Sequence, residues 1–298
     1  MGRAARVVVV GSVNVDLTIR LARIPRPGET IAGGTLSWSY GGKGGNQAAA
    51  AARLGATTTL IGMTGDDAPG VESRMDLRGF GVGIEGSLGY SPSPTGTAAI
   101  LLNDDGENAI AVASGANHDL TGEFVADAMG ALDAGPAVVL TNFEVPDDAI
   151  VAAAEIARQR RWPLVLNPAP ARPVPDAVIQ SVFAVTPNEE ELRAMGPVDR
   201  LLADGADNVV VTLGSRGADL HRSTEAKVHV DPYPVEVVDT TGAGDAFNGA
   251  LAWAFAGGRT FEDSVRLANG AGALACRAVG ARASLPDASE LLALVGRP

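Results

Sequence analysis

Short runs of aliphatic and β-branched residues recur along the chain, and most are separated by stretches of helical character. These runs cover residues 7–10, 57–61, 137–140, 164–166, 182–185 and 209–213. Helix-like stretches such as 46–54 and 147–158 lie between them. Because a continuous apolar run is typical of a strand buried on both faces, this alternation predicts an α/β fold with a mainly parallel sheet sandwiched by helices.

Two segments interrupt this alternation. Residues 14–40 contain strand-like pieces around Pro25, Pro27 and Gly28, and residues 95–115 form two short strands about an Asp-Gly turn, which is typical of a hairpin. Neither segment has the pattern of a strand-helix-strand unit. We expect them to form a small antiparallel β lid over one end of a Rossmann-like sheet, the alternative being that they are ordinary surface excursions.

No linker, repeat or low-complexity tract divides the chain into independent halves. We therefore expect residues 1–298 to form a single domain. Its core is predicted to comprise about 1–11, 41–92 and 112–298, and the inserted lid about 12–40 and 93–111.

Composition limits the possible partners and location. The formal net charge of −12 argues against nucleic acid or an anionic membrane as a partner. A single cysteine, Cys276, excludes an internal disulfide and suits a reducing compartment. The apolar run at 7–10 is too short for a signal peptide core or a membrane span. These features predict a cytoplasmic protein.

The stretch VVDTTGAGDAFNGALAWAFAGG at residues 237–258 joins a glycine turn to a helix. Gly242, Ala243 and Gly244 lack bulky side chains, so the backbone can expose consecutive N–H groups at the positive end of the helix dipole. This arrangement suits an anion, although such a turn also occurs without a ligand. Phe247 stands where a dinucleotide motif needs its third glycine, so the stretch is not a dinucleotide-binding fingerprint.

Apolar residues in this helix follow the spacing i, i+3, i+4, i+7, i+8, which predicts a stripe facing the core. This stripe comprises Phe247, Ala250, Leu251, Ala254 and Phe255. A second stripe in the next helix is predicted through Val265, Ala268, Gly272, Ala275 and Val279.

Asp245 lies directly after the glycine turn, where a carboxylate would repel a bound anion. A helix cap is one explanation for an acid at this position. Phosphoryl transfer is another, since the attacking hydroxyl must lose a proton while negative charge accumulates on the phosphoryl oxygens. Under this hypothesis Asp245 is a general base, which typically accelerates a reaction by about 10²–10⁴-fold, and the neighbouring N–H groups stabilise the oxygens.

A second glycine-rich motif, GGKGGN at residues 41–46, precedes an alanine-rich helix. It is not a P-loop, because Gly44 follows Lys43 where that motif needs Ser or Thr. Polar side chains elsewhere also follow strands, and ligands of open α/β sheets collect at the carboxyl ends of strands. Each residue alone is equally explained as a cap or turn former, but together they suit a polyhydroxylated small molecule: Asn14, Asp16, Lys43, Asn46 and Glu144.

Taken together, these motifs resemble the ribokinase branch of the PfkB carbohydrate kinase family over essentially the whole chain. The two signatures GGKGGNQA and DTTGAGDAFNGA occur at compatible separation. Further segments also resemble the family in chain order: GSVNVDL, DDGENAIAVASGAN, LNPAPAR, TPNEEE, VTLGSRG and VGARASLP.

The resemblance implies ATP-dependent phosphorylation of the 5-hydroxyl of D-ribose, with Asp245 as base and an anion hole formed by Gly242, Ala243 and Gly244. Two alternatives stay open. One is a kinase of the same family for deoxyribose, fructose or adenosine. The other is a catalytically silent regulator that binds sugar or nucleotide.

The resemblance also implies roles for individual residues. It places the sugar on Asn14, Asp16, Gly42, Lys43, Asn46, Glu144 and Asp245. It places ATP on Asn188, Thr212, Gly214, Ser215, Gly217, Gly244 and Asn269. Mg²⁺ is expected near Glu191 through water, although Asn188 and Glu191 are also explained as a helix cap and a first-turn acid. A monovalent cation, K⁺, is expected at Asp239, Thr241, Ala275, Ala278, Gly280 and Ser284. A homodimer through the lid is implied as well.

Three features depart from the family pattern or stay outside it. Gly45 stands where these kinases usually have alanine, and we expect this change to loosen the turn slightly. The stretch 192–211 is shorter than typical, which predicts a trimmed helix on the nucleotide side. The histidines match no metal or triad spacing, so we interpret them as surface or structural residues: His118, His221 and His229.

Overall fold

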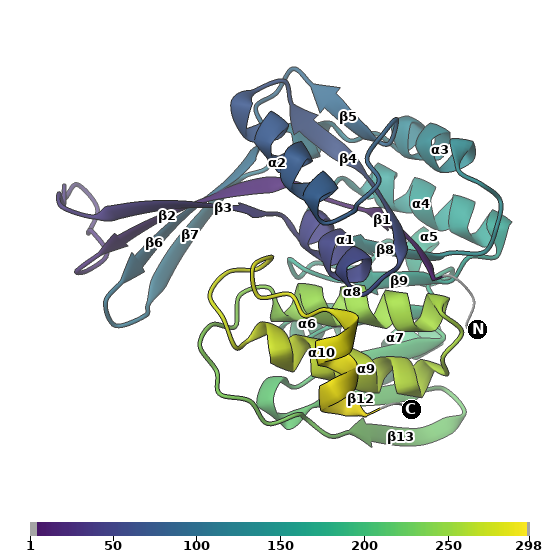
Figure 1. The fold of residues 1–298 in the computed structure, drawn as a ribbon. Coiled ribbons are helices and arrows are strands. Elements are labelled where there is room, and N and C mark those ends of the chain that lie inside the picture. The colour runs from purple at the N-terminus through teal and green to yellow at the C-terminus, as the bar shows by residue number, and fades with distance from the viewer. Residues whose placement is uncertain (1–4, 297–298) are drawn as a thin grey trace.

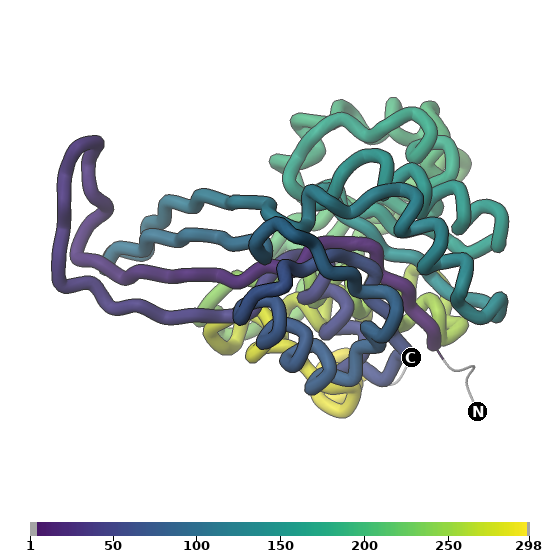
Figure 2. Tube along the Cα trace, turned by 90° about the horizontal axis from the view of Figure 1, so that it is seen from above, coloured from purple at the N-terminus to yellow at the C-terminus, as the bar shows by residue number. Residues whose placement is uncertain are grey.

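The computed structural model describes residues 5–296, so residues 1–4 and 297–298 of the predicted domain lie outside the described residues. The described chain contains a central sheet covered by helices and a second sheet that projects from one end as an arm (Figure 1). Figure 2 shows the arm extending well beyond the rest of the molecule.

The central sheet confirms the predicted mainly parallel arrangement. Its strand order is β13-β12-β11-β10-β9-β8-β1-β4-β5, in which all pairs from β11 to β5 are parallel and β11, β12 and β13 pair antiparallel. All six predicted strands are present. The strands are β1 Arg6–Val10, β4 Thr57–Gly65, β5 Leu88–Ser91, β8 Val138–Asn142, β9 Leu164–Asn167, β10 Ala184–Val185, β11 Asn208–Thr212, β12 Ala218–Arg222 and β13 Glu225–Val230.

Helices cover both faces of this sheet because its strands are apolar on both sides. In β1, Val8 and Val10 pack into one buried cluster, and Val7 and Val9 pack into another on the opposite face. The first cluster includes buried residues of five helices: α3 Gly122–Ala131, α4 Asp147–Arg160, α5 Asp176–Ile179, α6 Glu189–Met195 and α7 Val198–Asp204. The second includes α1 Lys43–Arg53, α2 Ala68–Gly79, α8 Ala243–Ala256 and α9 Phe261–Ala275, and α10 Ala288–Val295 packs on α9.

Two short 3₁₀-helices, η1 Gly115–Asp119 and η2 Gly214–Arg216, complete the elements. None of the helices formed by residues 5–296 combines the length and apolar character needed to cross a bilayer.

The predicted stripe of α8 faces the core, where Phe247, Ala250, Leu251 and Ala254 are buried and Phe255 stacks on Phe183 at 4.7 Å between ring centroids. The stripe of the next helix is wrong at its last position. Helix α9 ends at Ala275, and Val279 lies beyond it with 72% of its surface exposed.

The arm is a four-stranded sheet in the order β3-β2-β6-β7, comprising β2 Asn14–Leu21, β3 Thr35–Gly41, β6 Gly96–Asn103 and β7 Asn108–Ala113. The predicted hairpin is confirmed in β6 and β7, which turn through Gly106. The expected antiparallel pairing holds within each hairpin, but the central pair, β2 and β6, is parallel. Both central strands leave the core in the same direction because each follows closely on a central-sheet strand, β1 or β5.

The register of the arm separates two faces. Residues paired across strands share a face, so Asn14 and Asp16 lie on the same face as Ile110 and Val112, which we call the site face. The opposite, outer face carries Leu17, Ile19, Leu36, Trp38, Ala99 and Leu101. The alternating apolar residues of the hairpin are therefore divided between two surfaces.

Helices α1 and α8 pack closely because α8 has a glycine at the contact. A β-carbon at Gly249 would lie 2.7 Å from the carbonyl oxygen of Gln47 and 2.5 Å from the Ala50 Cβ. We expect Gly249→Ala to lower the free energy of unfolding by about 1–3 kcal/mol through overpacking, as measured by urea denaturation.

The matched control is Gly130→Ala in α3, where a β-carbon would meet nothing within 4 Å. This variant should be neutral or more stable by up to about 1 kcal/mol, since alanine favours a helix. Equal stability of the two variants would contradict a close α1–α8 contact at Gly249.

Candidate active site

Several polar residues, some of them predicted site residues, lie at the carboxyl ends of the central strands. Ser12 and Glu144 follow β1 and β8, and Asn167 ends β9. The N-terminus of α1 lies at the same edge, because the Lys43 backbone N–H donates to the Glu144 carboxylate. The N-terminus of α8 lies there too, because the side chains of two α1 residues donate to Asp245. This is the location expected for a ligand site in an open α/β sheet.

Asp245 is buried in a network of amides, with 7% of its surface exposed. One carboxylate oxygen accepts a hydrogen bond from Asn46 Nδ2 at 2.9 Å, and the other accepts from Gln47 Nε2 at 3.0 Å. Gln47 Nε2 also donates to Asn167 Oδ1 at 3.0 Å. These bonds hold the carboxylate in one orientation, and each oxygen has a second lone pair with which to accept a proton.

Sequence reasoning missed Gln47 and Asn167. Gln47 directly follows Asn46, which was a predicted site residue, so its position in the motif could have indicated it. Asn167 ends a buried strand, and the rule that singled out Glu144 after β8 applies to it equally.

The glycine turn at the start of α8 has the backbone that an anion site needs. Gly242 adopts a left-handed conformation with φ of 78°. A β-carbon built on Gly244 would meet nothing within 4 Å, so the space beside this residue is open. The Ala243 N–H donates to the Thr240 carbonyl at 3.2 Å, so it is already engaged within the turn. An anion at this turn would therefore rely on the amides of Gly242 and Gly244.

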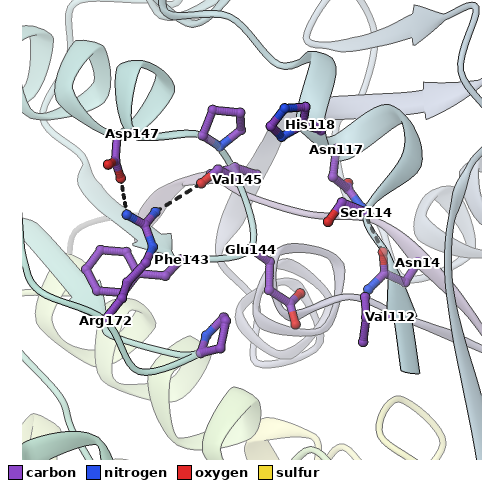
Figure 3. Close-up of a pocket in the computed structure, with 12 residues that line it drawn as sticks. Asn14, Val112, Ser114, Asn117, His118, Phe143, Glu144, Val145, Asp147 and Arg172 are labelled. Carbon is purple, nitrogen blue, oxygen red and sulfur yellow. Dashed lines mark hydrogen bonds and ion pairs between the residues drawn. The ribbon is translucent and has the colours of Figure 1, made fainter. Parts of the chain in front are cut away.

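Only part of the predicted sugar-binding set lines a cavity of about 520 Å³, a volume within the range of small-molecule sites (Figure 3). Asn14 and Glu144 both line it, and Asn14 Oδ1 accepts from Asn117 Nδ2 at 2.7 Å. His118, expected to be a surface or structural residue, also lines this cavity, as does Val112 from the site face of the arm. Asp16, Lys43, Asn46 and Asp245 are not among its lining residues.

Glu144 connects this cavity to the first glycine motif. Its carboxylate accepts hydrogen bonds from the Ser12 hydroxyl and from the Lys43 backbone N–H, the latter at 2.9 Å. Gly42 caps α1 with φ of 82°, and a β-carbon there would lie 2.7 Å from the Asn14 backbone nitrogen. Glycine thus allows the α1 N-terminus to approach the start of β2.

Three carboxylates and two cations share this region. Burial raises the pKa of Asp16 to about 6; Arg282 opposes this shift, and the charges of Glu144 and Asp245 add to it. Burial by itself lowers the pKa of Lys43, but the net shift is upward because Asp245, Glu144 and Glu191 favour its charged form. Lys43 therefore lies within electrostatic reach of Asp245, Glu144 and Glu191 of α6.

Arg282 is a site residue that sequence reasoning missed altogether. Its guanidinium is buried, and its Nε donates to Asn46 Oδ1 at 2.9 Å. No local pattern marks this residue, because it lies 236 positions from Asn46 in the chain. Only the packing of the C-terminal loop against α1 places it in the site.

The predicted nucleotide residues of α6 have a clear structural role. Asn188 Oδ1 accepts from the Glu191 N–H at 2.8 Å, and a Glu191 carboxylate oxygen accepts from the Asn188 N–H at 2.8 Å, which is a capping box. The structural interpretation of this pair is therefore confirmed, and any role toward phosphate or Mg²⁺ stays a prediction. Burial raises the pKa of Glu191.

The remaining nucleotide residues form a neighbouring edge. Thr212, at the end of β11, forms an isolated parallel β-bridge with Asn188. The 3₁₀-helix η2, which contains Ser215, begins two residues later. Gly214 and Gly217 both have positive φ, of 59° and 87°. Asn269 Nδ2 donates to the carbonyls of Val230 and Asp231 at 3.1 and 3.3 Å, so it anchors the segment after β13.

The predicted cation residues bring together two loops beside the glycine turn. Asp239 accepts from the Gly280 N–H at 3.0 Å and from the N–H and hydroxyl of Thr241 at 2.9 and 2.7 Å. These bonds outweigh burial and hold the pKa of Asp239 below its usual value. The Ser284 hydroxyl donates to the Gly280 carbonyl at 2.7 Å, while Ala275 ends α9 and Ala278 follows it.

Comparison with known proteins identifies the family of this chain. A family model described as pfkB family carbohydrate kinase matches residues 4–288. The chain is 35% identical over 286 residues to the ribokinase of Bacillus subtilis, covering 95% of this chain and 97% of that protein. It is 36% identical over 292 residues to the ribokinase of Lactococcus lactis subsp. lactis, covering 97% and 96%.

A solved structure of the Arabidopsis thaliana ribokinase complexed with ribose and ATP is similar over the same length. Its TM-score is 0.88 at 32% identity, with 99% of this chain and 100% of that chain covered. The resemblance carried by the two glycine signatures is thus confirmed, and the chain belongs to the pfkB family of carbohydrate kinases.

Proposed function

We propose that this enzyme transfers the γ-phosphoryl group of ATP to the 5-hydroxyl of D-ribose, releasing D-ribose 5-phosphate and ADP. The observation that carries the proposal is a buried carboxylate, Asp245, held by two amides directly after a glycine turn with open space beside it. The names of the relatives and the ribose and ATP of the Arabidopsis thaliana complex support ribose as the acceptor.

In this proposal Asp245 accepts the proton of the attacking hydroxyl. The hydroxyl oxygen forms a bond to the γ-phosphorus, the bond from that phosphorus to the β,γ-bridging oxygen breaks, and ADP leaves with the electron pair. The N–H groups of Gly242 and Gly244 stabilise the charge on the phosphoryl oxygens. Lys43, within reach of both sets of acids, adds a positive charge between acceptor and donor.

The sugar is held by polar groups at the base of the arm. Asp16 accepts hydrogen bonds from ribose hydroxyls, while Asn14 and Glu144 contact the sugar from the cavity that they line. Asn46 already bonds Asp245 and Arg282, so we assign it mainly to positioning the base, with its second Nδ2 hydrogen available to the sugar.

Two metal ions fit the donor sets of this chain. Glu191 and Asn188 would hold Mg²⁺ through water, and the ion would neutralise charge on the ATP phosphates. Oxygens of Asp239, Thr241, Ala275, Ala278, Gly280 and Ser284 are hard ligands suited to K⁺. A β-carbon at Gly242 would lie 2.7 Å from the Ala281 Cα, so the loop that contains Gly280 and Ser284 packs directly against the glycine turn. An ion that holds this loop in one conformation would therefore also hold the turn.

We propose a homodimer that forms through the outer face of the arm. That face is apolar, and its edge residues Leu36 and Trp38 are 55% and 62% exposed. The site face is the one that carries Asn14 and Asp16, so a partner on the outer face would leave the sugar accessible. The single cysteine further supports a cytoplasmic location.

The base is tested by Asp245→Asn. We expect kcat with ribose, ATP and Mg²⁺ to fall by about 10²–10⁴-fold, because the amide cannot accept the proton. Ribose binding measured by calorimetry should change less than tenfold.

Asp263→Asn is the matched control, because Asp263 occupies the same third position of α9 as Asp245 does of α8. It should keep wild-type kcat. Unchanged turnover in Asp245→Asn would refute the assignment of the base, and equal turnover of ribose, fructose and adenosine by the wild type would refute the substrate.

The raised pKa of Asp16 predicts a pH dependence of sugar binding. Above about pH 6 Asp16 is ionised and both of its oxygens accept from ribose, whereas below it the carboxyl is protonated, loses its charge and has one oxygen that carries a proton. The kcat/KM for ribose should therefore fall as pH drops through 6, approaching about tenfold per pH unit.

Asp16→Asn should give a low kcat/KM without this pH dependence. It should also raise the free energy of unfolding at pH 7.5, on the order of 1–3 kcal/mol. A raised folded pKa means that Asp16 stabilises the protein below its unfolded pKa and loses this contribution as pH rises through 6. A wild-type profile that is flat between pH 5 and 7.5 would contradict the role of Asp16.

The dimer is tested by Trp38→Asp, which places a charge on the outer face. We expect the sedimentation coefficient to shift from dimer to monomer, since burying an unpaired carboxylate is costly. The neighbouring variant Ser37→Asp lies on the opposite face and should remain dimeric. A wild-type protein that sediments as a monomer at micromolar concentration would rule out the proposed assembly.

A further inference from the structure

The guanidinium of Arg282 bonds three elements that lie more than 200 positions before it in the chain. Its Nε donates to Asn46 Oδ1 of α1 at 2.9 Å, and its Nη2 donates to the Gly41 carbonyl at the end of β3 at 2.7 Å. Its Nη1 forms an ion pair with Asp76 of α2 at 2.6 Å. With only 5% of its surface exposed, Arg282 connects the base of the arm to the helix that supports Asp245.

Gly45 provides the space for this guanidinium. A β-carbon built on Gly45 would lie 3.1 Å from the Arg282 Cζ and would overlap with Nη2. Gly45 is buried inside α1, where glycine is less favourable than alanine unless a close approach requires it. The departure from the family pattern at position 45 therefore makes room for Arg282, which is a different role from the looser turn expected from the sequence.

The bonds of Arg282 also decide which way the Asn46 amide points. Since the guanidinium only donates, it must face Oδ1, and this leaves Nδ2 to donate to Asp245. In the opposite orientation two donors would face each other, and Oδ1 would face the carboxylate. The orientation of a donor to the base is thus set by a residue that does not contact the base through a hydrogen bond.

We propose that Gly45 and Arg282 form a coupled pair that positions the active site: the guanidinium enters the space left by glycine, orients Asn46 toward Asp245, and ties the base of strand β3 to α1. Arg282 is a positioning residue in this scheme. The inference rests on the proposed function for its effect on catalysis, whereas the packing of the pair is independent of activity.

The coupling is tested by a double-mutant cycle of Gly45→Ala, Arg282→Gln and the two combined. Gly45→Ala alone should lower kcat by about tenfold, because its methyl group displaces the guanidinium. In the Arg282→Gln background the same change should cost less than about twofold, since the obstacle is gone. The same non-additivity should appear in urea unfolding, which needs no activity.

The pH dependence of kcat/KM for ribose is a second measurement. Its midpoint would not change if Arg282 had a purely structural role. Asp16 faces Arg282, Glu144 and Asp245, and Arg282 is the positive charge among them that favours its ionised form. In Arg282→Gln the midpoint of kcat/KM for ribose should therefore shift upward from about pH 6. Arg282→Lys, which keeps the charge, should return the midpoint toward the wild-type value.

The matched control is Arg74→Gln. Arg74 is also buried, and it donates to Thr64 of β4 and to the Gly89 carbonyl of β5, the edge strand of the central sheet. This variant should lose stability without changing the pH midpoint or the effect of Gly45→Ala.

Strictly additive effects of Gly45→Ala and Arg282→Gln in both kcat and unfolding would overturn the proposal. If Arg282→Gln does not fold, Arg282→Lys takes its place in the cycle, and additivity there has the same meaning. A wild type inactive on ribose would refute the proposed function, while non-additive unfolding in the same cycle would still support the pair.

Discussion

A buried carboxylate at the start of α8 is the constraint on which the rest of the site depends. Burying a charge is costly unless hydrogen bonds compensate it, and Asp245 obtains these from Asn46 and Gln47 of α1. This buried carboxylate, the proposed base, therefore requires that the N-terminal turns of two helices, about 200 residues apart in sequence, lie side by side. Small residues meet this requirement, since Gly249 lets α8 approach the backbone of α1.

The same constraint links the arm to the proposed active site. The strand that carries Asn14 and Asp16 continues from β1, and Gly42 brings α1 against its first residue. Arg282 then bonds both Asn46 and the carbonyl of Gly41 at the end of β3. The groups proposed to bind the sugar and to accept the proton thus share one framework, in which the positive charge of Arg282 interacts with the carboxylates of Asp16 and Asp245.

Much of the fold was predictable because its signals are local. Strands such as β8 and β9 are uninterrupted apolar runs, and the Asp-Gly turn between β6 and β7 marks a hairpin without reference to other residues. Where strands pair at long range the prediction was incomplete: nothing in β2 or β6 indicates that they run parallel. Val279 was wrongly given to a helix because periodicity alone does not show that α9 ends at Ala275.

Local motifs specify the residue types of the site, since the glycine turns, Lys43 and Asp245 lie in contiguous stretches whose chemistry depends on adjacent positions. The contacts between these residues arise from long-range packing. It engaged the Ala243 amide within its own turn, used Asn188 and Glu191 as a capping box, and placed Arg282 against Gly45. Hydrogen bonding and excluded volume act between neighbours in space, and residues 45 and 282 become neighbours only when α1 and the C-terminal loop pack together.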